Sequence, residues 1–489
     1  MYPNGCSRRG TLERDIFLNI SPLDSRYYRN SQNLLDSLSR YLSENALIQY
    51  EARVEAAIIV VMERKGLVGK GAASQIMEAY GRITPEEVYA EEERTRHNIR
   101  ALVKVMQRYV SPAVAPFIHL GATSEDITAT AQALRLRDVF FSVVLPKGLD
   151  FMDSILEIAE KESRTPQIGR THGQHAVPIT VGYLFSGYAD RFGGRLQRIV
   201  EAAEKLRGKI SGAVGAYNAT SLLFKDPRGF EEEVLSELGL KPANFSSQIV
   251  EPEYLLDLVH AVISAFGVLA QVSDDLRNLQ RTEIGELSER FEAEQVGSST
   301  MPHKRNPWNF EHVKSMWKEF VPRMITRYHD QISEHQRDLT NSASGRFIPE
   351  IIAAFVLAID RLLRQCKKIV IDYERIKRNL EATGGMFLAE PLYILLALKG
   401  VKDAHEVVKQ VTLLSQQEKK SIFEAARSHE ALREVADTAV WKALELNPSS
   451  YTGLSAERAL FICSYWRDRL SGMRKRCDQH KEIVNEYVE

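Results

Sequence analysis

Residues 296–307, VGSSTMPHKRNP, bring together side chains that could accept a proton and stabilise an anion. The second of two adjacent serines is Ser299, Lys304 is a cation, and Asn306 supplies an amide. Two prolines keep the segment from being helical, and a glycine loosens its start. A solvated basic loop is the ordinary alternative, but such a loop would need neither a methionine nor two prolines around one lysine. The combination therefore counts against a loop that is merely solvated.

A second segment, 169–182 (GRTHGQHAVPITVG), carries two histidines that lie three residues apart. Imidazole titrates near neutral pH, so His172 or His175 could give or take a proton. We expect both in a glycine-bounded loop before a helix, where a structural role is an equally good alternative. A zinc site would need further ligands nearby, and none is apparent. The four cysteines form no CxxC pair, so the sequence predicts no metal site.

Two further segments could receive anions. In 119–127, HLGATSEDI, Thr123 or Ser124 takes the N-cap position of a helix whose first turn is acidic. A helix N-terminus lined by hydroxyls can bind a carboxylate, although a plain capped helix would look the same. In 335–350, HQRDLTNSASGRFIPE, two arginines and a serine approach a helix opened by Pro349. That arrangement suits a phosphate or carboxylate, the alternative being solvated surface cations.

The elements around these loops show helical periodicity, and strand-like alternation is scarce. In one pattern, 86–110, a stripe is formed by Ile99, Val103, Met106 and Val110. After about 372 the helical units become shorter, with stops at the glycines near 384 and 400. We expect an elongated bundle that also buries surface against other copies of the chain. The other long patterns are 33–64, 124–163 with an interruption at Pro146, 177–208, 252–288, 307–334 and 346–371.

Length and composition bound the possibilities. A chain of 489 residues is too long for one ordinary core, and we place domain boundaries to give 1–115, 116–371 and 372–489. The 64 Lys and Arg residues nearly balance the 65 Asp and Glu residues. The net charge therefore does not favour binding to nucleic acid or to an acidic membrane surface. The apolar run at 258–273 looks too short to span a bilayer, and we read it as a buried helix. Scattered cysteines and an N-terminus without an apolar stretch predict a reducing, cytoplasmic location.

Taken together, these segments resemble the fumarase/aspartase superfamily. GSSTMPHKRNP resembles its long and specific signature loop, whereas HLGATSEDI, RTHGQHA and QRDLTNSASGR are most similar to the adenylosuccinate lyase family within it. The resemblance covers nearly the whole chain from about Ser21. It implies an all-α, fumarase/aspartase-like fold of three helical domains, with a long central bundle that forms a homotetramer and active sites shared between subunits.

The resemblance also implies a reaction. It is β-elimination of fumarate from adenylosuccinate, giving AMP, and from succinyl-aminoimidazole carboxamide ribotide, giving AICAR, in purine biosynthesis. Such an enzyme is a carbon–nitrogen lyase of the amidine-lyase type that uses neither metal nor organic cofactor. The hard step removes a proton next to a carboxylate, which needs a base and a site that stabilises developing negative charge.

Site residues follow from the resemblance residue by residue. Ser299 is the expected base, helped by Lys304 and Asn306, and His172 is the expected acid, with His175 a weaker candidate. His97 would help to arrange the site, although the next residue is Asn98 where the family commonly has Asp. On a helix His97 would align with Ala101, so only another subunit could cover it. The expected contacts to the succinyl part are Thr123, Ser124 and Gln248; those to the nucleotide phosphate are Arg26, Tyr27, Arg337, Ser342 and Arg346; Thr171 is a further substrate-binding residue.

Several alternatives stay open on the sequence. Argininosuccinate lyase usually has Ser-Arg-Asn-Asp, and fumarase and aspartase Ser-Asn-Asp, where this chain has ATSED at 122–126. Carboxymuconate cycloisomerase commonly lacks the histidine of RTH. The arginine cluster favours a nucleotide substrate, although the family commonly has Glu where this chain has Gln336. A non-catalytic structural protein could dispense with Ser299 and His172, and a nucleotide-binding regulator would need no closing loop.

Overall fold

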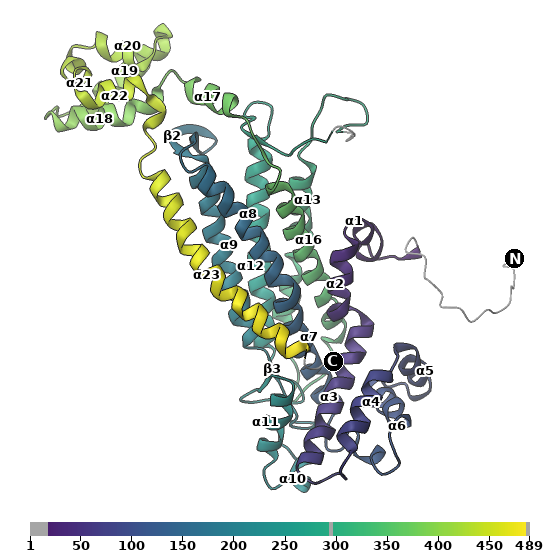
Figure 1. Ribbon diagram of the computed structural model, residues 1–489. Coiled ribbons are helices and arrows are strands. Elements are labelled where there is room, and N and C mark those ends of the chain that lie inside the picture. Colours follow the sequence, from purple (N-terminus) through teal and green to yellow (C-terminus); the bar gives the residue numbers. More distant parts are fainter. Residues whose placement is uncertain (1–17, 293–296, 486–489) are drawn as a thin grey trace. The chain divides into compact units, whose positions relative to one another are not determined.

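The computed structural model describes residues 18–292 and 297–485, and helices dominate it (Figure 1). The predicted all-α class is confirmed. The chain divides into two compact units, each assembled from separate stretches of sequence. Unit 1 comprises 18–139, 206–252 and 330–357; unit 2 comprises 140–205, 253–329 and 358–485 in the described part. The three-domain boundaries drawn from the sequence stay a prediction.

Unit 1 is built around α3, Glu44–Arg64, whose residues are buried on several faces. The single helix expected over 33–64 is divided at Ser43, whose hydroxyl caps α3 by accepting from the Ala46 N–H at 3.2 Å. The elements of unit 1 are a π turn at Leu23–Tyr27, α1 Tyr28–Asn30, α2 Gln32–Leu42, α3, α4 Ala72–Arg82, α5 Pro85–Thr95, α6 Asn98–Arg108, a 3₁₀ turn at Ala115–Phe117, α7 Ser124–Val139, β3 Arg207–Gly208, α10 Thr220–Leu223, α11 Pro227–Glu237, β4 Lys241–Pro242 and α15 Ser342–Arg346.

The pattern expected over 86–110 is likewise two helices. A capping box between Thr84 and Glu87 starts α5, and α5 ends at Arg96 in the left-handed region. Helix α6 then begins at Asn98. Three members of the predicted stripe are fully buried and confirm it, whereas Val110 lies beyond the helix and is half-buried.

Unit 2 contains long helices that pack along one another: α8, α9, α12 and α23, with α13 against α12 (Figure 1). The predicted interruption at Pro146 is confirmed, because a π turn precedes α8 and Pro146 lies in its first turn. The elements of unit 2 are the π turn Phe140–Val144, α8 Leu145–Lys161, β1 Pro166–Thr171, β2 Gln174–Thr180, α9 Val181–Glu204, α12 Glu253–Leu279, β5 Leu287–Ser288, α13 Trp308–Phe320, α14 Arg323–His329, β6 Val370–Ile371, α17 Tyr373–Glu381, α18 Ala389–Leu398, α19 Ala404–Glu418, α20 Ile422–Ser428, α21 Arg433–Ala436, α22 Ala439–Leu446 and α23 Ser455–Asn485, with 3₁₀ turns at Met386–Leu388, Glu430–Leu432 and Pro448–Ser450. Helix α16, Ile348–Cys366, begins in unit 1 and ends in unit 2.

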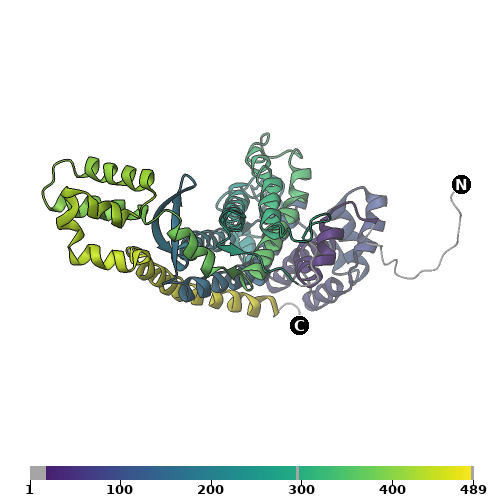
Figure 2. The same cartoon turned by 90° about the horizontal axis from the view of Figure 1, so that it is seen from above.

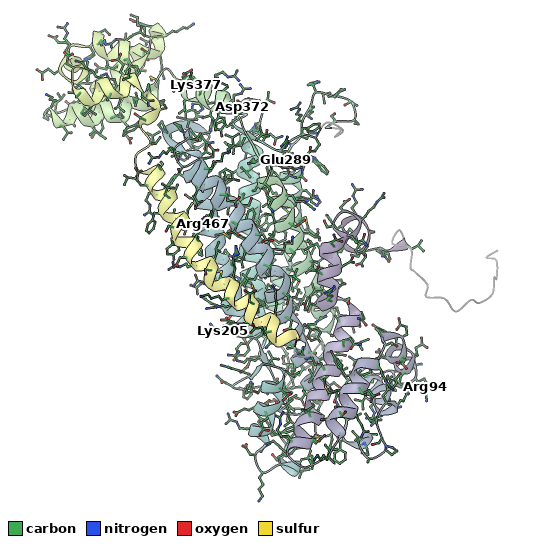
Figure 3. All side chains as sticks on the ribbon, in the orientation of Figure 1. Arg94, Lys205, Glu289, Asp372, Lys377 and Arg467 are labelled. Carbon is green, nitrogen blue, oxygen red and sulfur yellow. The ribbon has the colours of Figure 1, made fainter. Side chains whose placement is uncertain are left out.

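The expectation that only short helices follow residue 372 is wrong for α23, which has 31 residues. Its buried side chains recur at alternating steps of three and four, which is the spacing of a narrow helical stripe. Between residues 463 and 477 they are Cys463, Trp466, Leu470, Met473 and Cys477; Ser455, Ala459 and His480 are buried as well. On the polar side, Arg467, labelled in Figure 3, donates to both carboxylate oxygens of Glu160 on α8 at 2.7 and 2.8 Å. The shorter helices α18 to α22 form a group of their own (Figure 2).

The loop expected over 169–182 is also wrong, because most of it is strand. β1 and β2 form an antiparallel hairpin with a shift in register between Ile168 and Arg170. Thr180 ends β2 and caps α9, its hydroxyl accepting from the Tyr183 N–H at 3.1 Å. The helix predicted over 177–208 therefore starts at Val181. The other small sheets are parallel β3–β4 and antiparallel β5–β6.

Two helical segments of the described chain are long and apolar enough to cross a membrane, judged by length and composition alone. They are Glu253–Leu279, with a mean hydropathy of 1.8, and Ser342–Cys366, with 1.5; the bent pair Tyr373–Glu381 and Met386–Leu398 would be a third. The sequence-based statement that the run at 258–273 is too short is therefore wrong, since α12 extends beyond it at both ends. Within the protein, 61% and 56% of these two apolar windows are buried.

Candidate functional site

The turn between β1 and β2 consists of His172 and Gly173. Both have positive φ, 54° and 74°, as a two-residue type I′ hairpin turn requires. The turn thus fixes the backbone of His172 in the left-handed region. Thr171, His172 and His175 are all exposed. Although the His175 side chain is exposed, partial desolvation, followed by the charge of Arg170, lowers its pKa and so disfavours its protonated form.

The base of the same hairpin is anchored by Glu286, which the sequence analysis missed. Its carboxylate accepts four hydrogen bonds: two from Arg170, one from Gln167 at 2.7 Å and one from Asn379 of α17 at 2.7 Å. The Glu286 side chain is fully buried. Helix α17 is itself capped by Asp372, labelled in Figure 3, which accepts from the Arg375 N–H at 2.9 Å. The hairpin that carries His172 is therefore held by a buried carboxylate whose hydrogen-bonding capacity is fully used.

The loop 297–307 is closed at its neck and exposed beyond it. The Asn306 side chain donates to the Gly297 carbonyl at 2.9 Å, and a Cβ on Gly297 would lie 2.1 Å from the Lys304 carbonyl oxygen. Ser299 and Lys304 are exposed, whereas Asn306 is half-buried. The Ser298 hydroxyl oxygen accepts from the backbone N–H groups of residues 300 and 301, at 3.3 and 3.1 Å. Of the two adjacent serines, Ser298 is thus engaged in holding the loop, which leaves Ser299 as the better candidate for chemistry.

Two side chains tie this loop to the helices of unit 2. Gln280 donates to the Arg305 carbonyl at 3.2 Å and accepts from the Glu289 N–H at 2.9 Å. Glu289, labelled in Figure 3, accepts from the Asn309 side chain at 2.5 Å and from the Phe310 N–H at 2.9 Å. Burial raises the pKa of Glu289, although these two donors oppose the shift. The start of α13 and the end of the loop are held together by these contacts.

In unit 1 the segment 119–127 ends as predicted in a helix, with α7 beginning at Ser124 and an acidic first turn. Thr123 and Ser124 are half-buried. The Thr123 N–H donates to Asp126 Oδ2 at 2.8 Å. Asp126 is fully buried and forms an ion pair with Lys209, which is also fully buried. From the sequence, Asp126 was only an acidic residue in the first turn of the helix, and Lys209 was missed.

The remaining residues predicted to bind substrate also belong to unit 1. Gln248 is half-buried, and its backbone N–H donates to the Gln336 carbonyl at 3.3 Å, which joins the segment of Gln248 to that of Arg337. Arg337 Nη1 is buried and has no hydrogen-bond partner among the described residues. Such an orphaned guanidinium donor is costly unless it meets an anion. Tyr27 is half-buried, and the more exposed members of the set are Arg26, Ser342 and Arg346.

His97 does not lie on a helix, contrary to the sequence analysis. It is the N-cap of α6, with φ −155° and ψ 115°, and its Nδ1 accepts from the Arg100 N–H at 3.3 Å. The reason is Arg96, whose left-handed backbone ends α5 one residue earlier. Because Nδ1 is an acceptor, the neutral ring carries its proton on Nε2, which remains available on an exposed side chain.

His119 is a candidate that the sequence analysis passed over. Its Nδ1 lies 2.6 Å from the carboxylate of Glu55, whose side chain is fully buried. Burial alone would lower the pKa of His119, but the hydrogen bond and charge of Glu55 raise it. The residue also has a positive φ of 67°, two residues before Gly121. The signal in the sequence was its place at the start of HLGATSEDI.

The predicted residues thus fall into two sets. Thr171, His172, His175, Ser299, Lys304 and Asn306 belong to unit 2, and the remaining candidates to unit 1. In the part of the chain that the structure describes, no group of three or more His, Cys, Asp or Glu side chains is arranged to hold a metal ion. The chemistry available to these sets is acid–base catalysis by serine and histidine, together with binding of anions by arginines, hydroxyls and amides.

Comparisons with known proteins agree with this chemistry. Residues 26–320 match the family model described as lyase, and residues 333–452 match that described as adenylosuccinate lyase C-terminal. Adenylosuccinate lyases of Pyrococcus horikoshii and Pyrococcus abyssi are 35% and 36% identical over 460 residues, covering 91% of this chain and 98% of each relative. N-acetyl-S-(2-succino)cysteine lyase of Enterococcus italicus is 30% identical, over 87% of this chain and 93% of the relative.

Solved structures share the fold. The 3-carboxy-cis,cis-muconate lactonizing enzyme from Pseudomonas putida matches with a TM-score of 0.77 at 24% identity, covering 91% of this chain and 98% of that one. Fumarate lyase from Mesorhizobium sp. BNC1 matches with a TM-score of 0.78 at 21% identity, over 88% and 97%. With the family models spanning the signature loop and the segment of the clustered arginines, this chain belongs to the adenylosuccinate lyase family of the fumarase/aspartase superfamily.

Proposed function

We propose that this protein is an adenylosuccinate lyase that releases fumarate from adenylosuccinate, leaving AMP, and from succinyl-aminoimidazole carboxamide ribotide, leaving AICAR. The observation that carries the proposal is the identity of 35–36% to adenylosuccinate lyases across 91% of the chain. The chemistry of the two residue sets supports it, because one set holds an acid and a base and the other holds anion-binding groups.

The first chemical step breaks a C–H bond on the succinyl methylene carbon. The electron pair spreads into the neighbouring carboxylate, which becomes doubly negative. Ser299 takes the proton. A serine alcohol is far too weakly acidic to be ionised in water, so the alkoxide exists only where cations and backbone N–H groups surround it and water is excluded. Lys304 and Asn306, on the same loop, supply that environment when the loop closes over substrate.

The second step breaks the C–N bond, and the leaving nitrogen takes a proton from His172. The turn geometry supports this assignment, because the left-handed backbone at His172 holds the imidazole at the tip of the hairpin. His175 is less suited, since desolvation and the charge of Arg170 lower its pKa and so disfavour the protonated form that would give a proton. His97 orients the site through its exposed Nε2–H. Thr171 contacts the substrate beside His172.

Recognition of the substrate's two charged ends uses the other set. Thr123 and Ser124, at the N-terminus of α7, meet the succinyl carboxylates with Gln248. The orphaned Nη1 of Arg337 supports a role in binding the phosphate. The other groups assigned to the phosphate are Arg26, Tyr27, Ser342 and Arg346.

We further propose that the protein is a cytoplasmic homotetramer in which each active site draws residues from more than one subunit. The apolar character of α12 and α16 supports self-association, since only 61% and 56% of their apolar windows are buried within one chain. The tetramer would cover the remainder. No cofactor, nucleic acid or membrane enters the proposed reaction.

A substrate panel tests the function. Purified protein is mixed with adenylosuccinate, succinyl-aminoimidazole carboxamide ribotide, argininosuccinate or N-acetyl-S-(2-succino)cysteine, and fumarate is measured. The last compound is included because a 30% identical relative is named as the lyase for it. We expect fumarate and AMP in equal amounts from adenylosuccinate, and far slower release from the last two compounds. Faster turnover of either of those would replace the proposed substrate. Ser299→Ala protein prepared in parallel measures contaminating activity.

A further inference from the structure

The ion pair between Asp126 and Lys209 is the most completely buried one in the described part of unit 1, with both side chains at 0% exposure. Lys209 Nζ donates to Asp126 Oδ1 and to the Gly212 carbonyl, the latter at 3.1 Å. The backbone of Lys209 is fixed in turn by Thr130, whose hydroxyl accepts from the Lys209 N–H at 3.0 Å and donates to its carbonyl at 2.9 Å. Neither charge has a place in the acid–base chemistry.

The Asp126 carboxylate joins two segments that are far apart in sequence. Oδ2 accepts from the Thr123 N–H at 2.8 Å, in the turn that opens α7. Oδ1 accepts from the N–H groups of Ser211 and Gly212, at 3.1 and 3.2 Å, and Oδ2 also lies 3.2 Å from the latter. Oδ1 therefore holds only the segment of Ser211 and Gly212, whereas Oδ2 joins that segment to the turn at Thr123, and all the partners are donors.

A third segment continues from the second. The Ser211 hydroxyl lies 2.8 Å from the Ser246 hydroxyl. The backbones approach so closely that a Cβ on Gly215 would lie 1.9 Å from the Ser246 carbonyl oxygen. Gln248 follows two residues later. One buried carboxylate thus links the segment of Thr123 and Ser124 to the segment of Gln248, and these are the three residues assigned to the succinyl end.

Burying two charges is a poor way to gain stability, because an apolar pair of similar volume serves as well or better. A fixed carboxylate does, however, impose a geometry that an apolar pair cannot impose, since it aligns several N–H groups at once. We infer that Asp126 and Lys209 are positioning residues that hold Thr123, Ser124 and Gln248 where the succinyl carboxylates bind. The inference rests on the proposed function and adds two residues to it.

The substitution Asp126→Asn tests the positioning role separately from any effect on overall stability. An asparagine keeps the shape but has one acceptor oxygen and one NH₂ donor. If its oxygen faces Lys209 and Ser211, its NH₂ faces the N–H groups of Thr123 and Gly212. In the reverse orientation its NH₂ opposes three donors, which are Lys209 Nζ and the N–H groups of Ser211 and Gly212. Either way, one segment is released. The succinyl end should lose affinity while the phosphate end keeps it.

The test measures binding of fumarate and of AMP as separate probes, by calorimetry on the intact protein. For Asp126→Asn we expect fumarate to bind at least tenfold more weakly and AMP to change by less than twofold. The matched control is Ile59→Ala on α3, a fully buried residue outside the site whose loss destabilises the same unit. It should change neither affinity by more than twofold. Equal losses for the two probes in Asp126→Asn, or no loss for fumarate, would overturn the inference.

A double variant, Asp126→Asn with Lys209→Met, provides a second test of whether the ion pair positions the site or only stabilises the fold. Removing both charges should raise Tm above that of either single variant, because no unpaired charge stays buried. Fumarate should still bind at least tenfold more weakly than to the unaltered protein. Recovery of fumarate affinity together with Tm would mean that the pair is only structural.

Ser246→Ala carries the test if the Asp126 variants do not fold. It removes one neutral hydroxyl from the third segment, and we expect fumarate to bind about threefold more weakly with AMP unchanged. Unchanged fumarate binding would contradict the inference. Failure of the proposed function looks different, since the unaltered protein would then not cleave adenylosuccinate at all.

Discussion

The guanidinium of Arg170 donates to both carboxylate oxygens of Glu286, at 3.0 and 2.6 Å. Arg170 lies on β1, two residues before His172 in the turn, and Glu286 precedes β5. A residue at one end of the hairpin is thereby fixed to a buried group 116 residues away in sequence. The position of the proposed acid therefore depends on an ion pair that never touches substrate.

Glu286→Gln should destabilise the protein and slow its reaction. The glutamine would oppose its NH₂ to two of the four donors, because each oxygen of Glu286 accepts from two of them. Breaking a buried pair typically costs about 3 kcal/mol of unfolding free energy. Urea denaturation measures the first effect and fumarate release the second. Glu406→Gln, at an exposed pair with Lys409, is the control and should leave Tm and turnover unchanged. Equal behaviour of the two variants would remove Glu286 from this role.

Two glycine substitutions should act with opposite signs. Gly173 has a φ of 74° in the hairpin turn, so an alanine there is strained by about 1 kcal/mol even though nothing lies within 4 Å of its Cβ. Gly81, near the end of α4, also has open space but no positive φ. Its replacement by alanine should stabilise by about 0.5 kcal/mol. Thermal unfolding of both variants gives the signs, and stabilisation by Gly173→Ala would contradict the turn assignment.

Gly297→Ala should disable the catalytic loop without unfolding the protein. The added Cβ would meet the Lys304 carbonyl oxygen at 2.1 Å, so the neck must open and Ser299 must move. A displacement of about 1 Å can cost about 100-fold in rate. We expect kcat to fall by about that factor with little change in Tm. Gly69→Ala, where nothing lies within 4 Å, serves as control, and equal kcat values would show that the neck is not needed.

Stability should fall as pH rises, in part because of Glu51 on α3. Burial raises its pKa to about 8, although the charge of Arg135 opposes the shift. Between pH 4.5, which is near the pKa of Glu51 in the unfolded chain, and pH 8, the folded protein keeps the Glu51 carboxyl protonated, whereas the unfolded chain has lost this proton. The stability contributed by this proton is complete below pH 4.5 and is lost through pH 8, at about 1.4 kcal/mol per pH unit.

Glu51→Gln isolates that contribution. Its unfolding free energy should exceed that of the unaltered protein by more at pH 8 than at pH 6, because the glutamine has no proton to lose. Chemical denaturation at both pH values measures the difference. A difference that does not change with pH would mean that Glu51 has an ordinary pKa.

The helices and most of the breaks between them could be predicted from the sequence. Pro146 and the glycines near 384 and 400 act through local backbone chemistry, so their effects can be read without a structure. The hairpin at 166–180 was missed because its turn is His-Gly, with a histidine at positive φ, and not one of the usual Asn-Gly or Asp-Gly pairs. Helix α23 was missed because its buried stripe is narrow, although the steps of three and four from Cys463 to Cys477 were visible.

The chemistry-bearing residues could be proposed from their segments, since Ser299, His172 and Thr123 each lie in a long and specific motif. Their supports could not. Lys209 and Asp126 are 83 residues apart, and Arg170 and Glu286 are 116 apart, so only the folded chain shows that they meet. The cap at His97 depended on one left-handed residue, Arg96, which no periodicity reveals.

The most direct test of the central claim compares Ser299→Ala with Ser298→Ala in the cleavage of adenylosuccinate. Both variants remove one hydroxyl from the same loop, but only Ser299 is assigned to the proton, whereas Ser298 holds the backbone N–H groups of residues 300 and 301. We predict that kcat falls by about 1,000-fold or more in Ser299→Ala and by about tenfold or less in Ser298→Ala. Comparable rates in the two variants, or the larger loss in Ser298→Ala, would contradict the account.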